Sequence, residues 1–233
     1  MPKRETRRGD DAPGGKSFVP LLTDEQRKSL RHGARIVKLP PGGRIFASGD
    51  RADALFLVAS GKAKVEREDA GGRPLIVRLV GKGDTVGGRA LLAGERHSST
   101  ATAFCEMTLL RVGRDEVEQA MRDNSALAAY AVRALAVEAR TAWEFLAQMT
   151  QKQVRGRLAT ALLALRRKFG YVPGSRKVGV SVARKDLAAL SNMTVANAIR
   201  TLAAFAAEGV VEVGGRDVTI VDEEALAKIA RMG

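Results

Sequence analysis

The chain has 233 residues and a mass of 24.9 kDa, enough for one large domain or two ordinary domains with separate cores. Its 45% hydrophobic and 28% charged residues are typical of a globular protein and exclude a chain that is disordered throughout. The 39 lysines and arginines outnumber the 26 acidic residues, which gives a net charge of +13 and a pI near 10.4. This excess favours a polyanionic partner such as DNA, RNA or an anionic membrane.

Residues 1–16 are charged, carry prolines and glycines, and lack an apolar core segment. We therefore expect a flexible basic tail rather than a signal peptide or a membrane span. No later apolar stretch reaches the roughly 20 residues that a membrane helix requires, so no membrane partner is predicted. The single cysteine, Cys105, cannot form an internal disulfide and indicates a reducing, cytoplasmic setting. We expect it to be a small buried strand residue, with a redox role as the alternative.

Turn signals cut residues 34–112 at a nearly regular spacing, with pairs such as Gly42-Gly43 and Gly83-Asp84. Short apolar or alternating runs lie between them, at residues 54–58, 63–65, 75–80 and 109–112. Regularly spaced short strands predict an antiparallel sandwich or barrel. We therefore expect an antiparallel β-roll, or jelly roll, over residues 17–122.

Beyond Gly113 no glycine occurs until Gly156, and helix-forming residues dominate, which predicts a long helix over residues 123–149. Its apolar residues alternate in steps of four and three and form a heptad seam: Ala128, Val132, Leu135, Ala139, Ala142, Leu146 and Met149. The seam predicts a dimer interface with a second copy. The alternative is a helix packed on its own β domain through Tyr130, Trp143 and Phe145, and one long helix can do both.

Residues 150–233 predict three helices, at 154–169, 184–190 and 195–208, followed by a hairpin. The compact turn of residues 191–194 joins the last two helices, with Thr194 as the N-cap, so these helices form a helix-turn-helix. The hairpin pairs residues 210–213 with 218–221 around a glycine turn and forms a wing. The predicted fold class is therefore α+β: a β-roll, a long helix and a winged helix-turn-helix.

Residues 151–200 hold eleven basic side chains against one acid, Asp186, a local charge of +10. This favours DNA as the polyanion, since a merely solvated helical face usually mixes both signs. The second helix of the motif would present its N-terminal residues to the major groove, where Arg200 can read guanine and Asn197 adenine. For Asn197, a contact with phosphate or water is an equal alternative. The predicted DNA-binding residues are Arg184, Lys185, Thr194, Val195, Ala196, Asn197, Arg200 and Arg216.

Several segments resemble, in order, the cyclic-nucleotide-binding β-roll: residues 18–25 (FVPLLTDE), 39–42 (LPPG), 49–50 (GD), 54–61 (ALFLVASG) and 83–87 (GDTVG). With the long helix and the helix-turn-helix, residues 18–221 are similar to the CRP/FNR superfamily of bacterial transcription regulators. The resemblance implies a homodimer joined through the long helix, with each recognition helix in the major groove of a two-fold symmetric site on double-stranded DNA. It also implies contact with RNA polymerase.

The resemblance also implies an effector pocket, for which the candidate residues are Gly87, Gly88, Arg89, Ala90, Arg96, His97, Ser98, Ser99, Ala142 and Trp143. Nucleotide-binding members carry a glutamate where this chain has Gly88, an arginine where it has His97, and a hydroxyl pair at residues 142–143. Arg96 or Arg89 could replace the arginine, and Trp143 could fill the vacated space. These three losses argue against cAMP as the effector. The alternative is a switch that responds to a cyclic nucleotide or another small ligand through a non-standard site.

Other sensor types fit the sequence less well. A single cysteine excludes an iron–sulfur sensor. A haem-sensing branch of the superfamily uses an N-terminal proline with a histidine or cysteine. The candidate haem ligands here are Pro2, His32, His97 and Cys105, none of which stands at the start of the long helix. Two histidines, one cysteine and no grouped acid and base motif also argue against an enzyme, and no cofactor or metal site is predicted.

Overall fold

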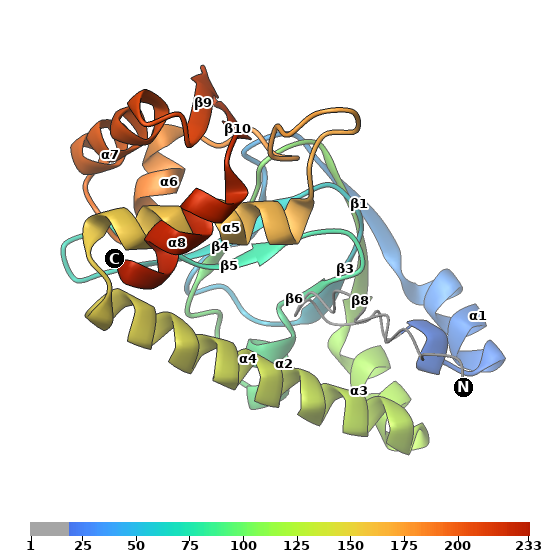
Figure 1. Cartoon of the computed structure of the whole chain (residues 1–233). Helices are drawn as coiled ribbons and strands as arrows, with labels where there is room; N and C mark the ends of the chain where they lie inside the picture. Colours follow the sequence, from blue (N-terminus) through green and yellow to red (C-terminus); the bar gives the residue numbers. More distant parts are fainter. Residues whose placement is uncertain (1–18) are drawn as a thin grey trace, which may run out of the picture.

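The protein was analysed as a computed structural model, which describes residues 19–233. The basic tail predicted over residues 1–16 lies outside the described residues. Along the chain follow a β-roll, the long helix α4 (Ser125–Gln151) and a helical domain with a two-stranded wing (Figure 1). This order confirms the predicted α+β fold class. In the described part of the chain, no helix has the length and apolar character needed to cross a membrane.

Two four-stranded antiparallel sheets form the β-roll. The first contains, in spatial order, β1 (Arg35–Leu39), β8 (Met107–Gly113), β3 (Ala54–Ser60) and β6 (Thr85–Val86). The second contains β2 (Arg44–Phe46), β7 (Thr100–Ala103), β4 (Ala63–Glu68) and β5 (Pro74–Val80). Alternate residues of β3, namely Ala54, Phe56 and Val58, are buried in the core of the roll. The alternation in the sequence therefore sets which face of the strand packs inward.

Short helices accompany the roll: α1 (Asp24–Gly33), α2 (Gly88–Ala93) and α3 (Arg114–Asp123), after the 3-10 turn Val19–Leu21. Asn124 separates α3 from α4 and caps the N-terminus of α4, because its Oδ1 accepts hydrogen bonds from the backbone N–H groups of Ala126 and Leu127. Its Nδ2 donates to Leu21 O at 2.9 Å. This contact anchors the start of the long helix to the N-terminal segment.

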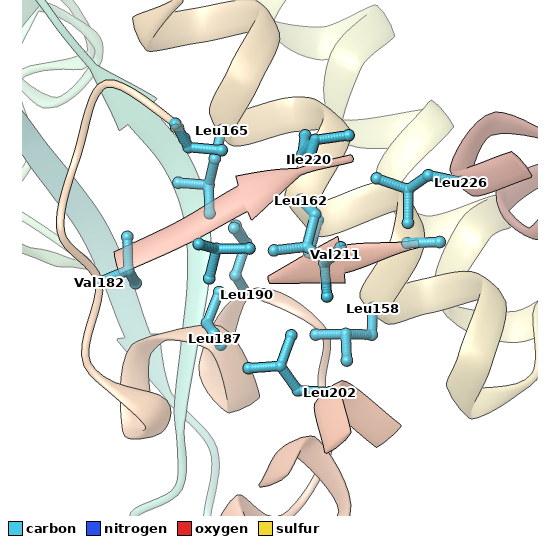
Figure 2. Close-up of a cluster of buried hydrophobic side chains, with 14 of the residues drawn as sticks. Leu158, Leu162, Leu165, Val182, Leu187, Leu190, Leu202, Val211, Ile220 and Leu226 are labelled. Carbon is cyan, nitrogen blue, oxygen red and sulfur yellow. The ribbon is translucent and has the colours of Figure 1, made fainter. Parts of the chain in front are cut away.

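The helical domain comprises α5 (Val154–Phe169), α6 (Arg184–Leu190), α7 (Val195–Ala207), the wing strands β9 (Val211–Gly214) and β10 (Asp217–Ile220), and α8 (Glu223–Met232). Its core brings together leucines of four helices and branched residues of the wing (Figure 2). The terminal helix α8 was not predicted. It begins at the N-cap Asp222, whose Oδ1 accepts from Ala225 N at 2.9 Å, and it packs against α5.

The helical domain is docked on the β-roll, with α5 and α6 beside β4 and β5 (Figure 1). Ile76 of β5 is fully buried and belongs to the core of the helical domain. Lys64 Nζ of β4 lies 2.8 Å from Asp186 Oδ1 of α6, and both side chains are largely buried. Lys168 of α5 forms a second ion pair, with the buried Asp84 of the roll. Apolar contact and charge pairing therefore both join the two domains.

One expectation about the roll is wrong. Cys105 is not a buried strand residue: it is half-buried and lies in the turn between β7 and β8. This turn passes so close to Gly61 that a Cβ atom there would stand 2.6 Å from Glu106 O. β7 ends at Ala103, before the cysteine is reached.

Candidate nucleic-acid interface and effector site

The turn between α6 and α7 is held by hydrogen bonds to both helices. Ser191 Oγ donates to Leu187 O at 2.8 Å, and Thr194 Oγ1 accepts from Asn197 N at 3.2 Å, which confirms Thr194 as the N-cap. Asn192 adopts φ of 47°, a left-handed conformation that asparagine tolerates better than most residues. Arg157 of α5 donates to Ser191 O at 3.0 Å. These contacts set the angle at which α7 leaves the turn.

Helix α7 divides into an inner and an outer face. Ala198, Leu202 and Phe205 are buried against the domain core. On the outer face Arg200 Nη2 donates to Asn197 Oδ1 at 2.5 Å. Asn197 and Arg200 are three positions apart in the sequence, which places their side chains side by side on the helix. The structure therefore pairs the two predicted base readers: Asn197 orients the Arg200 guanidinium while the protein is free.

The predicted residues at the start of α7, namely Thr194, Val195 and Ala196, are all exposed, and Asn197 is half-buried. The sequence analysis missed Ile199, which is 49% exposed on the same helix. Its place four residues after Val195 is the signal that could have found it, because residues i and i+4 share a helical face.

The three other predicted basic residues differ in where they point. Lys185, in the first turn of α6, and Arg216, in the wing turn, are exposed. Arg184 is half-buried, and its Nη2 donates to Gly215 O at 2.6 Å. Its Nη1 is buried and finds no hydrogen-bond partner within residues 19–233. In this structure Arg184 ties the wing to α6, whereas Lys185 and Arg216 are free to face a phosphate backbone.

Acidic side chains beyond residue 200 form ion pairs with basic side chains of residues 151–200 and so reduce the local charge of this segment. The pairs are Arg155 with Glu208, Arg166 with Glu223, and Lys177 with Asp217. The hydrogen bonds from Arg155 lower the pKa of Glu208 and so favour its charged form. Residues 151–233 contain fourteen basic and seven acidic residues, a net +7. The domain is basic, but the charge of +10 counted for residues 151–200 overstates its excess.

At the candidate effector site, His97 is buried against Phe46 and Gly87. The rings of His97 and Phe46 stack with centroids 3.7 Å apart and planes 7° from parallel. A Cβ at Gly87 would lie 3.4 Å from His97 Cε1. Burial lowers the pKa of His97 and outweighs the negative charges of Asp50 and Asp53, which act in the opposite direction, while the positive charge of Arg89 adds to the effect of burial. A neutral imidazole therefore lies beside Gly87, where the resemblance to nucleotide-binding members implies a cationic arginine.

The two arginines near His97 are held differently. Arg89 is exposed, and its Nη2 donates to Ser98 Oγ at 2.5 Å. Arg96 is also exposed, but its Nη1 donates to Gly49 O at 2.7 Å. Of the other predicted pocket residues, Ala90 is buried, Gly88 and Ser99 are half-buried, and Ala142 and Trp143 are exposed on α4. The structure thus brings Gly87, Arg89, His97 and Ser98 together.

Trp143 does not fill the pocket of its own chain, since it is 72% exposed on the surface of α4. Of the three aromatic residues expected to pack on the β domain, Tyr130 does so in a small cluster with Leu22 and Leu127. Phe145 is half-buried. The apolar contact of α4 with the roll is therefore made near the start of the helix, and Glu138 at its middle forms a long ion pair with Arg78 of β5.

The predicted heptad seam is largely uncovered in the single chain. Val132 is 66% exposed and Leu146 54% exposed, and Ala139 and Ala142 between them are exposed too. The remaining members, Ala128, Leu135 and Met149, are half-buried. No group of three histidine, cysteine, aspartate or glutamate side chains in residues 19–233 is placed to hold a metal ion.

Both halves of the chain match known protein families. Residues 36–124 match the cyclic nucleotide-binding domain family, and residues 156–229 match the Crp-like helix-turn-helix domain family. A CRP-like cAMP-activated global transcriptional regulator of Mycobacterium tuberculosis is 30% identical, over 84% of this chain and 88% of that protein. The cyclic AMP receptor protein of Thermus thermophilus is 33% identical, over 93% and 97%. The chain belongs to the CRP/FNR family.

As a CRP/FNR protein, the chain is a transcription regulator rather than an enzyme, and it binds DNA through its Crp-like helix-turn-helix. Solved structures share the fold. FixK2 from Bradyrhizobium japonicum superposes with a TM-score of 0.75 at 21% identity, over 84% of this chain and 96% of that one. The architecture of roll, long helix and winged helix-turn-helix is therefore that of the family.

Proposed function

We propose that the chain acts as a homodimer that binds a two-fold symmetric site on double-stranded DNA. The observation that carries this proposal is the exposed face of α7, where Arg200 stands beside Asn197, together with the exposed Lys185 of α6 and Arg216 of the wing turn. In such a dimer each α7 enters one major groove, and the half-sites lie about 34 to 36 Å apart, one helical turn. The basic residues around α7 neutralise phosphates and so favour binding at low salt.

The uncovered seam of α4 supports the dimer. Val132 and Leu146 expose apolar surface that the β-roll of the same chain leaves uncovered, and a parallel α4 of a second copy would bury it. We also propose a cytoplasmic location, which the single cysteine favours, and contact with RNA polymerase, which the family resemblance implies.

We further propose that cAMP does not control the protein through the usual pocket. The cyclic phosphate is an anion, and a buried neutral His97 offers it no countercharge. Gly88 offers no carboxylate for the ribose hydroxyl. A ligand-responsive switch is the second candidate, because both relatives above carry cAMP in their names and because Arg89 with Ser98 forms an exposed pair suited to an anionic group.

Selection of binding sites from random DNA, followed by mobility shift with and without a panel of nucleotides, tests both proposals. A palindromic consensus bound by the ligand-free protein is expected. An asymmetric consensus contradicts the two-fold arrangement. Calorimetry measures the binding of cAMP directly. A low micromolar dissociation constant, together with DNA affinity that depends on cAMP, contradicts the proposal that cAMP does not control the protein and favours the ligand-responsive switch.

A further inference from the structure

Two aliphatic side chains stand on the solvent face of α7 beside Arg200. Val195 is 43% exposed and Ile199 is 49% exposed. They are four positions apart in the sequence, so they lie one turn apart on the same face. The exposed Ala196 continues this face, which is therefore apolar except for Arg200 and its partner Asn197.

These two side chains are not needed to hold the domain together. Ala198, Leu202 and Phe205 supply the inner face of α7, and Val195 and Ile199 lie outside the hydrophobic clusters of the described chain. Their apolar surface is free to be buried when a partner covers the outer face of the helix. Each buried methyl or methylene group would then stabilise the complex.

The surroundings of the pair identify the partner. Lys185 in the first turn of α6 and Arg216 in the wing turn are both exposed, and both suit phosphate contact. Between such contacts, the N-terminal residues of the second helix meet base edges in the major groove. The apolar group that base edges present in this groove is the C5 methyl of thymine.

We infer that Val195 and Ile199 select thymine by burying its C5 methyl group, next to the base pair that Arg200 contacts. The inference rests on the proposed function, in which α7 enters the major groove. Each half-site then contains at least one thymine at a fixed step from the base pair contacted by Arg200. Specificity comes from apolar contact as well as from hydrogen bonds.

The first test uses DNA that lacks single methyl groups. Sites are selected with the full-length protein, and each thymine of the half-site is then replaced, one at a time, by deoxyuridine. Deoxyuridine keeps the hydrogen-bonding groups of thymine and loses only the methyl. Affinity, measured by fluorescence anisotropy at constant salt, is expected to fall about fourfold at one or two positions, the effect of one buried methyl group. At the other thymines it is unchanged.

The second test removes the side chains. In Val195→Ala and Ile199→Ala, the ratio of thymine to deoxyuridine affinity falls toward one at the position that each side chain covers. Val221→Ala is the matched control, because Val221 is exposed to a similar degree but lies outside α7. Its ratio stays at the wild-type value. Thermal melting of the variants verifies that each remains folded.

Three results overturn the inference. If deoxyuridine is neutral at every position while binding stays sequence-specific, methyl groups are not read, although the proposed function stands. If both alanine variants keep the wild-type ratio, other residues read the methyl groups. If the protein selects no DNA sequence at all, the proposed function itself fails.

Discussion

His97 stands where the resemblance implies a charged arginine, and its ring stacks on Phe46. Because burial lowers the pKa of His97, the unfolded chain takes up a proton near the ordinary histidine pKa of about 6.5, and the folded chain does so only at lower pH. Stability is therefore fully present above pH 6.5 and declines as the pH falls toward the folded pKa. The total loss is about 1.4 kcal/mol for each unit by which the folded pKa is lowered.

Urea unfolding between pH 7.5 and 5.5 measures this loss. In His97→Asn the free energy of unfolding changes less over this range than in the wild type. His32→Gln, which removes the other histidine, serves as the control and keeps the His97 contribution. Equal pH dependence in the wild type and His97→Asn means that the imidazole is not held neutral.

Arg200 and Lys185 have different expected roles in DNA binding. Arg200→Ala removes a bidentate contact, which costs about 1 to 3 kcal/mol and relaxes the preference at one base pair of each half-site. Lys185→Ala removes a phosphate contact, so it weakens binding to all sequences alike and lowers the salt slope by about one. Binding titrations at several salt concentrations, on selected and scrambled sites, separate the two effects. An unchanged base preference in Arg200→Ala contradicts the assignment of Arg200 as a base reader.

At the scale of elements, local signals account for much of the helical domain. The bounds predicted for α5 and α6 match the structure, because each helix combines an apolar repeat with a clear stop. The helix α8 was missed although Asp222 caps it, since its short apolar repeat gains stability only by packing on α5. Strands β1, β2, β6 and β7 are not among the predicted runs for a related reason: each is short and depends on its neighbours in the sheet.

The candidate interface was predictable only in part. Thr194 and Arg200 follow from capping and helical spacing. The hydrogen bond between Asn197 and Arg200, and the use of Arg184 to hold the wing, depend on side-chain directions and on a hairpin brought in from later in the chain. Spacing within the sequence carries no information on such contacts.

The seam of α4 carries a prediction about assembly. Leu135 is the third of the seven seam residues, and Leu135→Glu would place two like charges across the helix pair. We expect the wild type to be a dimer at micromolar concentration and this variant to be a monomer that binds a palindromic site weakly. Sedimentation velocity measures both. Ala136→Glu adds the same charge at an exposed position off the seam and should remain dimeric. A monomeric wild type shows that the seam does not pair.

Across the whole molecule, the buried ion pair of Lys64 and Asp186 links the two domains. Burial opposes the charge of Lys64, but hydrogen bonds to Asp186 and Glu66 outweigh this effect, and the pKa of Lys64 is raised. Lys64→Met leaves Asp186 buried without its partner, which is expected to cost about 3 kcal/mol of stability. The double variant Lys64→Met/Asp186→Leu recovers most of this loss, because the more exposed Glu66 is then the one carboxylate of this ion-pair cluster that has lost its partner.

Urea unfolding of the two single variants and the double variant gives the coupling energy. Arg73→Ala, which breaks an exposed ion pair with Asp69, is the control, and its expected cost is below about 1 kcal/mol. If Lys64→Met costs no more than this control, the ion pair does not help to hold the helical domain on the roll.

The exposure of Trp143 makes the protein its own fluorescent probe. The chain contains one tryptophan, so all indole emission comes from this position on α4, directly after seam residue Ala142. When two copies pair along α4, water near the indole is displaced. The emission maximum then shifts to shorter wavelength as the protein concentration rises, and iodide quenches the emission less. A dilution series of the unlabelled protein yields its dimer dissociation constant, and the same signal followed after rapid dilution yields the lifetime of the dimer.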